Sequence, residues 1–514
     1  MQTPETIAAL IDARAADAAE LPYFIGAESG REMNYGELQR SCRRISALLA
    51  RAGLASGDTV SVVMPNGRQT VRVLLGAMYG GWCVNPVNLL SQPEQMLYVL
   101  EHSDCKLIVV APDWMERVQA LLRRMDRKVQ LIAVDPDAEA IEGESEVDSA
   151  QSAPTALASA MALLMYTSGT TGKPKGVMLT QSNLCANARA ISAEHLLQRD
   201  DRVAAVLPLY HINAFAVTLL APIAHAGALV MPAKFSTAGF WPMVAAHRCT
   251  WINVVPTMIS YLLEGTPADT PLARSELAAV RFCRSASAAL PPEHHRAFED
   301  KFGIGIVETM GFTETVAPAF SNPIDQTLRK IGSVGRASGC EARIVDESGK
   351  ELPDGETGEL VMRGPQVMSG YYKNPEATAG AFFAEGWLRS GDLGRRDADG
   401  FFFVTGRIKE LIIKGGENIA PREIDEALLR HPAVLDAASV GIPDRHYGQE
   451  IMACVILREG ERCSEEELRV FCVEHLGRYK TPKLFRFVSD LPRGPSGKVQ
   501  RLKLIDLASA TEPS

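Results

Sequence analysis

The stretch that decides the fold is Tyr166-Thr-Ser-Gly-Thr-Thr-Gly-Lys-Pro-Lys-Gly176, which directly follows the apolar run Met161–Met165. Its last ten positions hold three glycines, four Ser or Thr hydroxyls and two lysines. Glycine lets backbone N–H groups approach an anion closely, hydroxyls add donors, and lysines add positive charge. It is not a Walker A loop, because Pro174 stands where Ser or Thr would follow the lysine. A glycine-rich segment behind a strand predicts a polyphosphate-binding loop and not a flexible linker.

The composition of the 514 residues predicts a soluble protein of more than one domain. Apolar residues make up 46% and charged residues 22%, as in ordinary globular proteins. The net charge of −9 argues against a general nucleic-acid binder. The 10 cysteines include no C-x-x-C pair, so neither a zinc site nor a disulfide framework is predicted. No secretory signal or membrane span is predicted, and we expect a cytoplasmic protein.

Short β-branched runs alternate with longer helical patterns, such as Leu38–Ala50, through the first two-thirds of the chain. This alternation predicts βαβ units and largely parallel sheets. The acidic, Ser-rich segment between Asp135 and Pro154 is predicted to be an exposed connection between subdomains. The predicted strands are Val60–Met64, Leu107–Val110, Leu131–Val134, Val203–Leu207, Leu229–Met231 and Ile252–Val255.

The pattern changes from about Gly335 to Val404, where turn signals separate short alternating strands. After Arg407 a further small segment of strands and helices begins. We therefore predict an α/β protein with a large N-terminal domain of stacked, doubly wound α/β subdomains. A small antiparallel β unit would complete that domain, and a small α+β C-terminal domain would follow.

Five further motifs follow the glycine-rich loop. In type and order, all six resemble the signatures of the adenylate-forming superfamily, which includes acyl-CoA synthetases, adenylation domains of peptide synthetases and luciferases. The resemblance covers most of the chain from the loop onward. The five motifs are Met310-Gly-Phe-Thr-Glu314, Ser390-Gly-Asp-Leu393, Thr405-Gly-Arg-Ile-Lys-Glu410, Lys414-Gly-Gly-Glu-Asn-Ile-Ala-Pro421 and Pro495-Ser-Gly-Lys-Val-Gln-Arg501.

The resemblance implies an ATP site. Thr313 would contact the α-phosphate and the substrate carboxylate, and Glu314 would bind Mg²⁺, a hard cation that prefers carboxylate and phosphate oxygens. Met310 stands where the superfamily usually has a tyrosine that stacks on adenine, and a thioether can also cover a ring face. The loop residues implied to contact ATP are Thr167, Ser168, Gly169, Thr170, Thr171, Gly172 and Lys173.

By the same resemblance, Asp392 would accept hydrogen bonds from the ribose hydroxyls, and Arg407 would contact the ribose or phosphate. Lys409 falls at the hinge of the superfamily, about which the C-terminal domain swings between two half-reactions. The expected division is therefore a large ATP- and acyl-binding domain, residues 1–408, and a small mobile domain, residues 410–514.

Gly415, Gly416 and Glu417 resemble the segment that lines the pantetheine tunnel of acyl-CoA synthetases. The resemblance makes Lys498 the catalytic lysine of adenylation, because a cation that bridges the carboxylate and the α-phosphate lowers the barrier. Pro492 and Gly497-Lys498 fit the pattern that protein acetyltransferases recognise in related ligases. A lysine acetyltransferase and deacetylase acting on Lys498 are therefore expected partners, since acylation removes the charge.

Two segments resemble the walls of the acyl pocket. His211 would border the pocket, and Ala286 and Ser287 stand where glycines are common. Together with Trp251, these side chains would narrow the pocket. Arg284 would either face the acyl cavity or form a structural ion pair, because side chains alternate along a strand.

The implied function is an ATP-dependent carboxylate–CoA ligase that forms AMP and pyrophosphate and uses Mg²⁺ and coenzyme A. The run Cys283-Arg-Ser-Ala-Ser-Ala288 looks like oxalate-activating ligases, yet Val316-Ala-Pro318 stands where those carry a histidine. A different small anionic acid, such as sulfoacetate or a dicarboxylate, is therefore a candidate.

The alternatives are a ligase for short- or medium-chain or aryl acids and a stand-alone adenylating enzyme that loads a carrier protein. A regulatory nucleotide-binding protein without catalysis is a further reading, disfavoured because the four motif residues with charged roles are all retained. These residues are Glu314, Asp392, Arg407 and Lys498.

Overall fold

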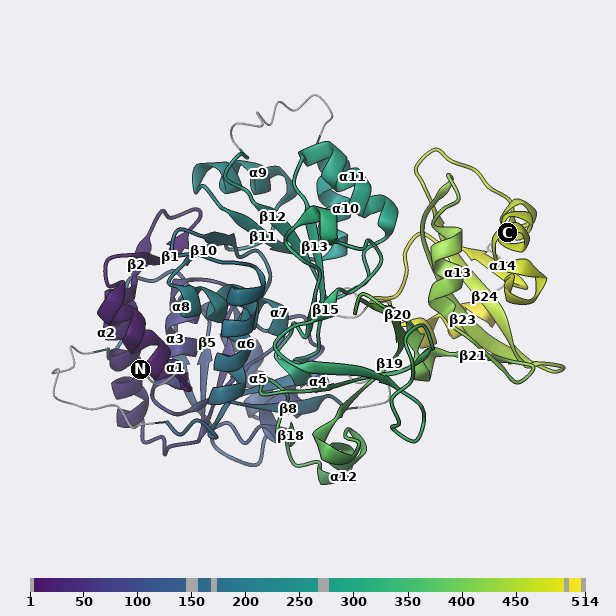
Figure 1. Cartoon of the computed structure of the whole chain (residues 1–514). Coiled ribbons are helices and arrows are strands. Elements are labelled where there is room, and N and C mark those ends of the chain that lie inside the picture. The colour runs from purple at the N-terminus through teal and green to yellow at the C-terminus, as the bar shows by residue number, and fades with distance from the viewer. Residues whose placement is uncertain (1–3, 145–155, 168–172, 267–276, 494–498, 510–514) are drawn as a thin grey trace. The chain divides into compact units, whose positions relative to one another are not determined.

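The computed structural model describes residues 4–144, 156–167, 173–266, 277–493 and 499–509. The chain forms two compact units, each with its own sheets and helices (Figure 1). The first unit comprises Met1–Glu341 and Arg363–Phe382, and the second comprises Ala342–Met362 and Phe383–Ser514. Among the described residues, no helix is both long enough and apolar enough to span a membrane.

One sheet of the first unit has seven strands. Five of its strands, from β7 to β6 in spatial order, run parallel to one another. Strands β8 and β18 add antiparallel pairs at the β7 side of the sheet. The residues of β3, β4 and β5 are buried throughout, as expected for parallel strands covered on both faces. In spatial order the strands are β18 (Gly370–Tyr371), β8 (Lys175–Thr180), β7 (Met161–Thr167), β4 (Cys83–Pro86), β3 (Thr59–Val63), β5 (Leu107–Val110) and β6 (Gln130–Ala133).

The other sheet of this unit has nine strands. The six strands from β13 to β1 run parallel, and β14, β15 and β2 add antiparallel pairs at the two edges. In spatial order they are β15 (Arg336–Ala337), β14 (Phe320–Ser321), β13 (Ile306–Met310), β12 (Phe282–Ser285), β11 (Trp251–Val254), β9 (Arg202–Ala204), β10 (Ala228–Met231), β1 (Pro22–Gly26) and β2 (Glu32–Asn34).

A layer of helices connects the two sheets. Helix α3 contacts β3 and β4, whereas α2 contacts β1 and β2, and α2 packs on α3. Two of these helices begin at side-chain caps that their sequences supply: Asn34 pairs with Glu37 at α2, and Thr180 pairs with Asn183 at α6. The layer consists of α1 (Ile7–Asp17), α2 (Tyr35–Arg51), α3 (Arg68–Tyr79), α6 (Gln181–Glu194) and α8 (Ala221–His225).

The outer faces of both sheets are covered by further helices. Helices α9, α10 and α11 lie beside β11 to β13 (Figure 1). An apolar core of β-branched, Leu and aromatic side chains joins β10 to β13 with these helices. A second core joins β5 with α4 and α5. The bounds are α4 (Pro93–His102), α5 (Met115–Leu122), α7 (Ile212–Ala214), α9 (Thr237–Ala246), α10 (Pro256–Gly265), α11 (Pro292–Phe302) and α12 (Pro375–Gly380).

The second unit contains a four-stranded and a five-stranded sheet. Arg422 donates from its Nη1 to the carbonyl of Val404 at 2.9 Å, which ties α13 to β20. The four strands are β16 (Glu341–Val345), β17 (Gly358–Arg363), β19 (Leu388–Arg396) and β20 (Phe402–Arg407). The five are β22 (Glu417–Ile419), β21 (Ile412–Lys414), β24 (Gly448–Leu457), β23 (Val434–Asp444) and β25 (Leu484–Phe487), with helices α13 (Pro421–Leu428) and α14 (Glu465–Lys480).

The predicted α/β class, with stacked α/β subdomains, a small antiparallel unit and a small C-terminal α+β part, is confirmed. The predicted strand at Val203–Leu207 extends three residues too far, since β9 ends at Ala204. Most described residues after Asp135 are exposed, as predicted, but the Glu144 carboxylate is 5% exposed and pairs with Arg72. The domain boundary at Lys409 stays a prediction.

Candidate active site

Parallel strands of the nine-stranded sheet bring the predicted residues to one edge. Strands β9, β11, β12 and β13 run in the same direction, so the segments that follow them share the carboxyl-terminal edge. In open α/β sheets, ligands bind outside this edge. Met310 ends β13, Ala286 and Ser287 follow β12, and His211 caps the start of α7 in the segment after β9.

The turn after β13 holds Thr313 and Glu314 in place. Gly311 permits this turn, because a Cβ there would lie 2.8 Å from the Cα of Pro318. The carbonyl of Glu314 accepts a hydrogen bond from the amide of Met368 at 2.8 Å. Its Oε1 accepts the Tyr371 hydroxyl at 2.8 Å. Burial, and then the charge of Glu314, raise the pKa of Tyr371 well above its usual value, so this hydroxyl stays a donor.

Tyr371 also joins Glu314 to the strand that follows the predicted phosphate loop. It lies in β18, which pairs with β8, the strand that leaves the loop. The Nζ of Lys175, the first residue of β8, lies 4.7 Å from the centre of the Tyr371 ring. Lys173 lies over the ring of Tyr98 at 5.3 Å. Residues 168–172 of the loop, and with them five of the predicted ATP contacts, lie outside the described residues.

The Glu314 surroundings fit a magnesium ion that is shared with phosphate. Among the described residues, no group of three or more His, Cys, Asp or Glu side chains could hold a metal by itself. Mg²⁺ is usually bound by one or two carboxylates together with substrate phosphates and water. Glu314 supplies one carboxylate beside the loop, so a magnesium–nucleotide complex fits better than a metal bound by protein alone.

The Arg284 side chain is buried and is held by amide oxygens. It is 1% exposed, and its Nη1 donates to Asn213 Oδ1 at 2.6 Å and to Asn253 Oδ1 at 2.7 Å. Its Nε has no hydrogen-bond partner in the part of the chain that the structure describes. Burial lowers the pKa of Arg284 to about 9, which leaves it charged at neutral pH. The predicted alternative, a structural ion pair, is not formed with any described carboxylate.

Trp251 lies beneath this arginine. Trp251 and Asn253 are two residues apart on β11 and so point to the same face of the sheet. The Trp251 ring stacks on Phe282 at 5.5 Å and on His195 at 6.3 Å between centroids. Trp251 therefore contributes to an aromatic floor at the amino-terminal side of Arg284. Its predicted contact with the acyl group stays a prediction.

Ser287 and Ala286 lie on the opposite side of Arg284, immediately after β12. Asn213 donates from its Nδ2 to Ser287 Oγ at 3.2 Å, so the same amide that holds the arginine also contacts this segment. Ser287 has a φ of 75°, a left-handed conformation that glycine adopts more readily. Ala286 is buried, and the ring of His211 packs edge-on against Tyr210 at 4.7 Å.

The second unit positions the predicted nucleotide contacts Asp392 and Arg407. They face each other across β19 and β20, with Arg407 Nε 2.9 Å from Asp392 Oδ1. Asp392 is 3% exposed. Lys409 lies in a single 3₁₀ turn, Ile408–Glu410, between β20 and β21. Lys498 lies outside the described residues.

Gly415 and Gly416 form a two-residue hairpin turn between β21 and β22. In the strand register, Lys414 lies opposite Glu417. Their φ angles are 55° and 88°, as a type I′ turn requires at both central residues. The residue before the turn is held in place by its side chain: Lys414 Nζ forms an ion pair with Glu450 Oε1 at 2.5 Å and lies 5.0 Å from the centre of the Tyr479 ring. A Cβ on Gly416 would meet no atom of the described residues within 4 Å.

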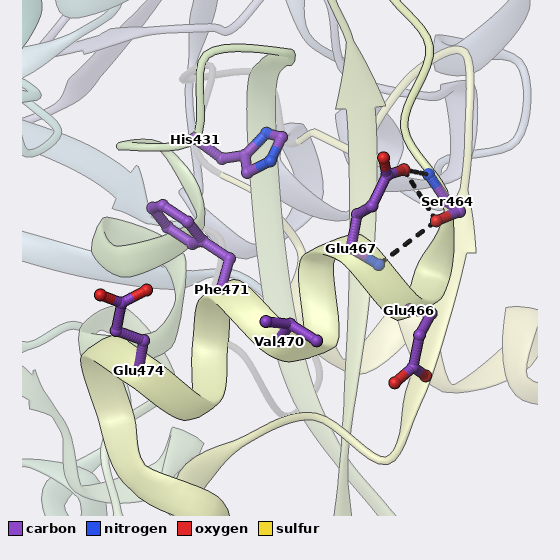
Figure 2. A pocket seen from close by; sticks show the side chains of 7 residues that line it. All are labelled: His431, Ser464, Glu466, Glu467, Val470, Phe471 and Glu474. Carbon is purple, nitrogen blue, oxygen red and sulfur yellow. Dashed lines mark hydrogen bonds between the residues drawn. The ribbon is translucent and has the colours of Figure 1, made fainter.

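A hollow of about 590 Å³ lies elsewhere in the second unit, beside α14, and Figure 2 shows its seven lining side chains. None of the predicted site residues lines it. Glu467 points at the start of α14, where its carboxylate accepts from Ser464 and its amide donates to the Ser464 hydroxyl. These contacts form a helix cap, so this carboxylate is already used structurally.

Comparison with known proteins shows to which family the chain belongs. A model of the AMP-binding enzyme family matches residues 11–372, and a model of the AMP-binding enzyme C-terminal domain matches residues 423–498. The chain belongs to the AMP-binding enzyme family. Together with the curated ligases that are similar to it along nearly its whole length, this makes it an AMP-forming acid–thiol ligase that uses ATP, Mg²⁺ and coenzyme A.

Among its relatives, the ligase is 56% identical over 505 residues to the sulfoacetate–CoA ligase of Cupriavidus necator, covering 98% of both chains. It is 36% identical to the oxalate–CoA ligase of Arabidopsis thaliana, covering 89% of this chain and 90% of the relative. The crystal structure of ATP-bound MatB from Rhodopseudomonas palustris matches with a TM-score of 0.89 at 29% identity, covering 97% and 99%. The o-succinylbenzoate coenzyme A synthetase of Bacillus subtilis, in complex with ATP and magnesium, matches with 0.83 at 29% identity, covering 96% and 98%.

Sequence reasoning assigned no role to three residues that the structure brings into the site. Asn253 and Tyr371 carry no motif, because they reach the site through strand pairing with distant segments. Asn213 lies two residues after His211, but nothing in that local sequence indicates a contact with Arg284. Register along β11 and β12, which places Asn253 opposite Arg284, is the signal that would have identified one of them.

The Gly416 turn gives a first prediction. Gly416→Asn should keep the turn, because Asn tolerates a left-handed backbone, but it adds a side chain to a segment implied to line the pantetheine path. Such a group would occupy part of the path of the thiol arm, and we expect the loss to be at least about 1.4 kcal/mol. We therefore expect CoA-dependent thioester formation to fall at least about tenfold, with ATP–pyrophosphate exchange retained. Unchanged thioester formation in a variant with wild-type exchange would leave the glycine with a turn role alone.

Proposed function

We propose that the ligase activates a small acid that carries a second anionic group, with sulfoacetate as the leading candidate. The observation that carries this proposal is the Arg284 guanidinium, which is buried and charged yet has only amide oxygens as partners among the described residues. A charge in such surroundings is costly unless an anion joins it. The 56% identity to a sulfoacetate–CoA ligase supports the same substrate.

The reaction has two half-reactions. In the first, a carboxylate oxygen of the acid forms a bond to the α-phosphorus of ATP, and the bond from that phosphorus to pyrophosphate breaks. In the second, the thiol sulfur of coenzyme A forms a bond to the acyl carbon, loses its proton, and AMP leaves. Bound Mg²⁺ offsets the negative charge of the phosphate oxygens during the first half-reaction.

We assign the roles of this chain's residues as follows. Thr313 would donate its hydroxyl to the α-phosphate or the attacking carboxylate, and Glu314, oriented by Tyr371, would hold the metal–phosphate complex. Lys498 would bridge the two anions that meet in adenylation. Arg284 would bind the second anionic group through charge-assisted hydrogen bonds, which also orients the carboxylate for attack.

The sulfonate subsite also limits substrate length. The aromatic floor of Trp251, Phe282 and His195 lies directly beneath Arg284 and is buried. A long acyl chain would have to displace this packed layer, which protein interiors resist because they are close-packed. We expect catalytic efficiency to fall beyond roughly six carbons, given the modest size of cavities in this class.

A panel of acids tests the proposal through pyrophosphate release and mass detection of the CoA thioester. Sulfoacetate and malonate carry a second charge, whereas methylsulfonylacetate has nearly the shape of sulfoacetate without that charge. We expect kcat/KM for sulfoacetate to exceed that for methylsulfonylacetate at least about tenfold, a difference of 1.4 kcal/mol. Equal efficiencies, or efficient turnover of octanoate, would contradict the proposal. A phosphopantetheinylated carrier protein, offered in place of coenzyme A, tests the carrier-loading alternative.

The proposed cycle also includes a rotation of the C-terminal domain and a reversible modification of Lys498. Residues 410–514 would rotate about Lys409 between the half-reactions, so that Lys498 serves the first and Gly415, Gly416 and Glu417 serve the second. Acetylation of Lys498 by a lysine acetyltransferase would remove the charge that adenylation needs, and a deacetylase would restore it. We place the enzyme in the cytoplasm, where ATP and coenzyme A are available.

A further inference from the structure

The two asparagines around Arg284 form an unusual set of ligands for a buried cation. Asn253 is fully buried and lies opposite Arg284 in the register of β11 and β12, and Asn213 reaches it from α7. Both amide oxygens accept from the same guanidinium nitrogen, at 2.6 and 2.7 Å. Buried charges are normally paired with an opposite charge. Here the two nearest acceptors are neutral.

Other groups near Arg284 do not neutralise it. His195 lies in the aromatic floor, and burial, followed by the positive charge of Arg284, lowers the pKa of His195 to about 3. It is therefore neutral at physiological pH. No carboxylate among the described residues forms an ion pair with the guanidinium. No described residue accepts from the Arg284 Nε, so one buried donor of the guanidinium group is unsatisfied.

The asparagines both hold the guanidinium at its Nη1, and they also contact each other. Asn253 donates from its Nδ2 to Asn213 Oδ1 at 3.4 Å, and Asn213 Nδ2 donates to Ser287 Oγ at 3.2 Å. This chain fixes the amide orientations, so that both oxygens face Arg284. An aspartate has nearly the shape of asparagine and would stabilise the buried charge by pairing with it. The sequence thus places neutral amides around Arg284, and these fix the position of the guanidinium without cancelling its charge.

We infer that Asn213 and Asn253 are specificity-determining residues that position the Arg284 guanidinium while leaving its charge for the second anionic group of the acid. This inference rests on the proposed function, because it concerns the same subsite. An aspartate at either position would form an internal ion pair with Arg284. The substrate's second anion would then meet a neutral pair and would lose its advantage over an uncharged group of the same shape.

The test uses the full-length variants Asn253→Asp and Asn213→Asp. For each, kcat/KM is measured with sulfoacetate and with methylsulfonylacetate, and the ratio of the two is compared with that of the wild-type enzyme. We expect the ratio to fall at least about tenfold in each variant. A merely structural defect lowers both efficiencies together and leaves the ratio unchanged, and that outcome would overturn the inference. Both variants should fold, because the new carboxylate gains a buried partner.

Asn253→Ser serves as the neutral control. It removes the amide contact without adding charge, so its ratio should stay closer to wild type than that of Asn253→Asp. If the serine variant lost the preference as fully as the aspartate variant, charge would not be the cause and the inference would fail. If the wild-type enzyme itself showed no preference for sulfoacetate, the proposed function would fail first. A wild-type preference that survives both aspartate variants would refute this inference alone.

Discussion

Lys498→Ala is expected to slow adenylate formation about a thousandfold. Two unit charges about 4 Å apart at an effective dielectric near 20 interact by roughly 4 kcal/mol, and losing that much transition-state stabilisation gives a rate loss of this size. The physical reason is that the carboxylate and the α-phosphate are both anions, and a cation between them stabilises their approach. The second half-reaction has no such encounter. Conversion of supplied acyl-adenylate and coenzyme A to the thioester should therefore be nearly unchanged.

ATP–pyrophosphate exchange reports the first half-reaction, and thioester formation from synthetic acyl-adenylate reports the second. Lys503→Ala is the matched control, because Lys503 is an exposed lysine a few residues further along the chain. It should leave both rates at the wild-type level. An equal loss in both half-reactions for Lys498→Ala would contradict the proposal that Lys498 serves only the first half-reaction.

The sequence predicts most of the fold because its signals are local. The apolar, β-branched runs that become β3, β5, β10 and β11 are buried strands at or within one or two residues of their predicted bounds. Ser464 and Glu467 have the local spacing of a capping box, and the structure forms that box at the start of α14. Strand ends are less well determined, since β9 stops at Ala204 although apolar residues continue to Leu207. Hydrophobicity predicts burial there but not strand pairing.

The site was less predictable because its contacts join distant segments. The sequence alone does not decide the orientation of Arg284, since alternation along β12 allows either face. Its partner Asn213 lies 71 positions away, and the pair forms only when α7 packs over the sheet. Glu144 shows the same limit: an acidic, Ser-rich segment predicts exposure, yet this carboxylate pairs with the buried Arg72. Such long-range pairing has no local pattern.

Arg284→Met is expected to lower kcat/KM for sulfoacetate about a hundredfold, or about 2.7 kcal/mol, and to erase the preference over methylsulfonylacetate. Removing one partner of a buried, hydrogen-bonded charge pair costs about 2–5 kcal/mol, and the sulfonate would be left in surroundings without a counter-charge. Methylsulfonylacetate loses no ion pair, so its efficiency should change much less. Methionine is similar in length to the arginine stem and carries no charge.

The variant should remain folded, because it removes a buried charge that no described carboxylate neutralises, and replacing such a charge by an apolar group is often neutral for stability. Thermal unfolding checks this. Arg284→Lys is the matched partner: it keeps the charge but loses the planar fork that meets two oxygens at once. Its preference for sulfoacetate should lie between those of the wild-type enzyme and the methionine variant. A full wild-type preference in Arg284→Met would show that another residue binds the second anion, because a guanidinium that binds it cannot be removed without loss.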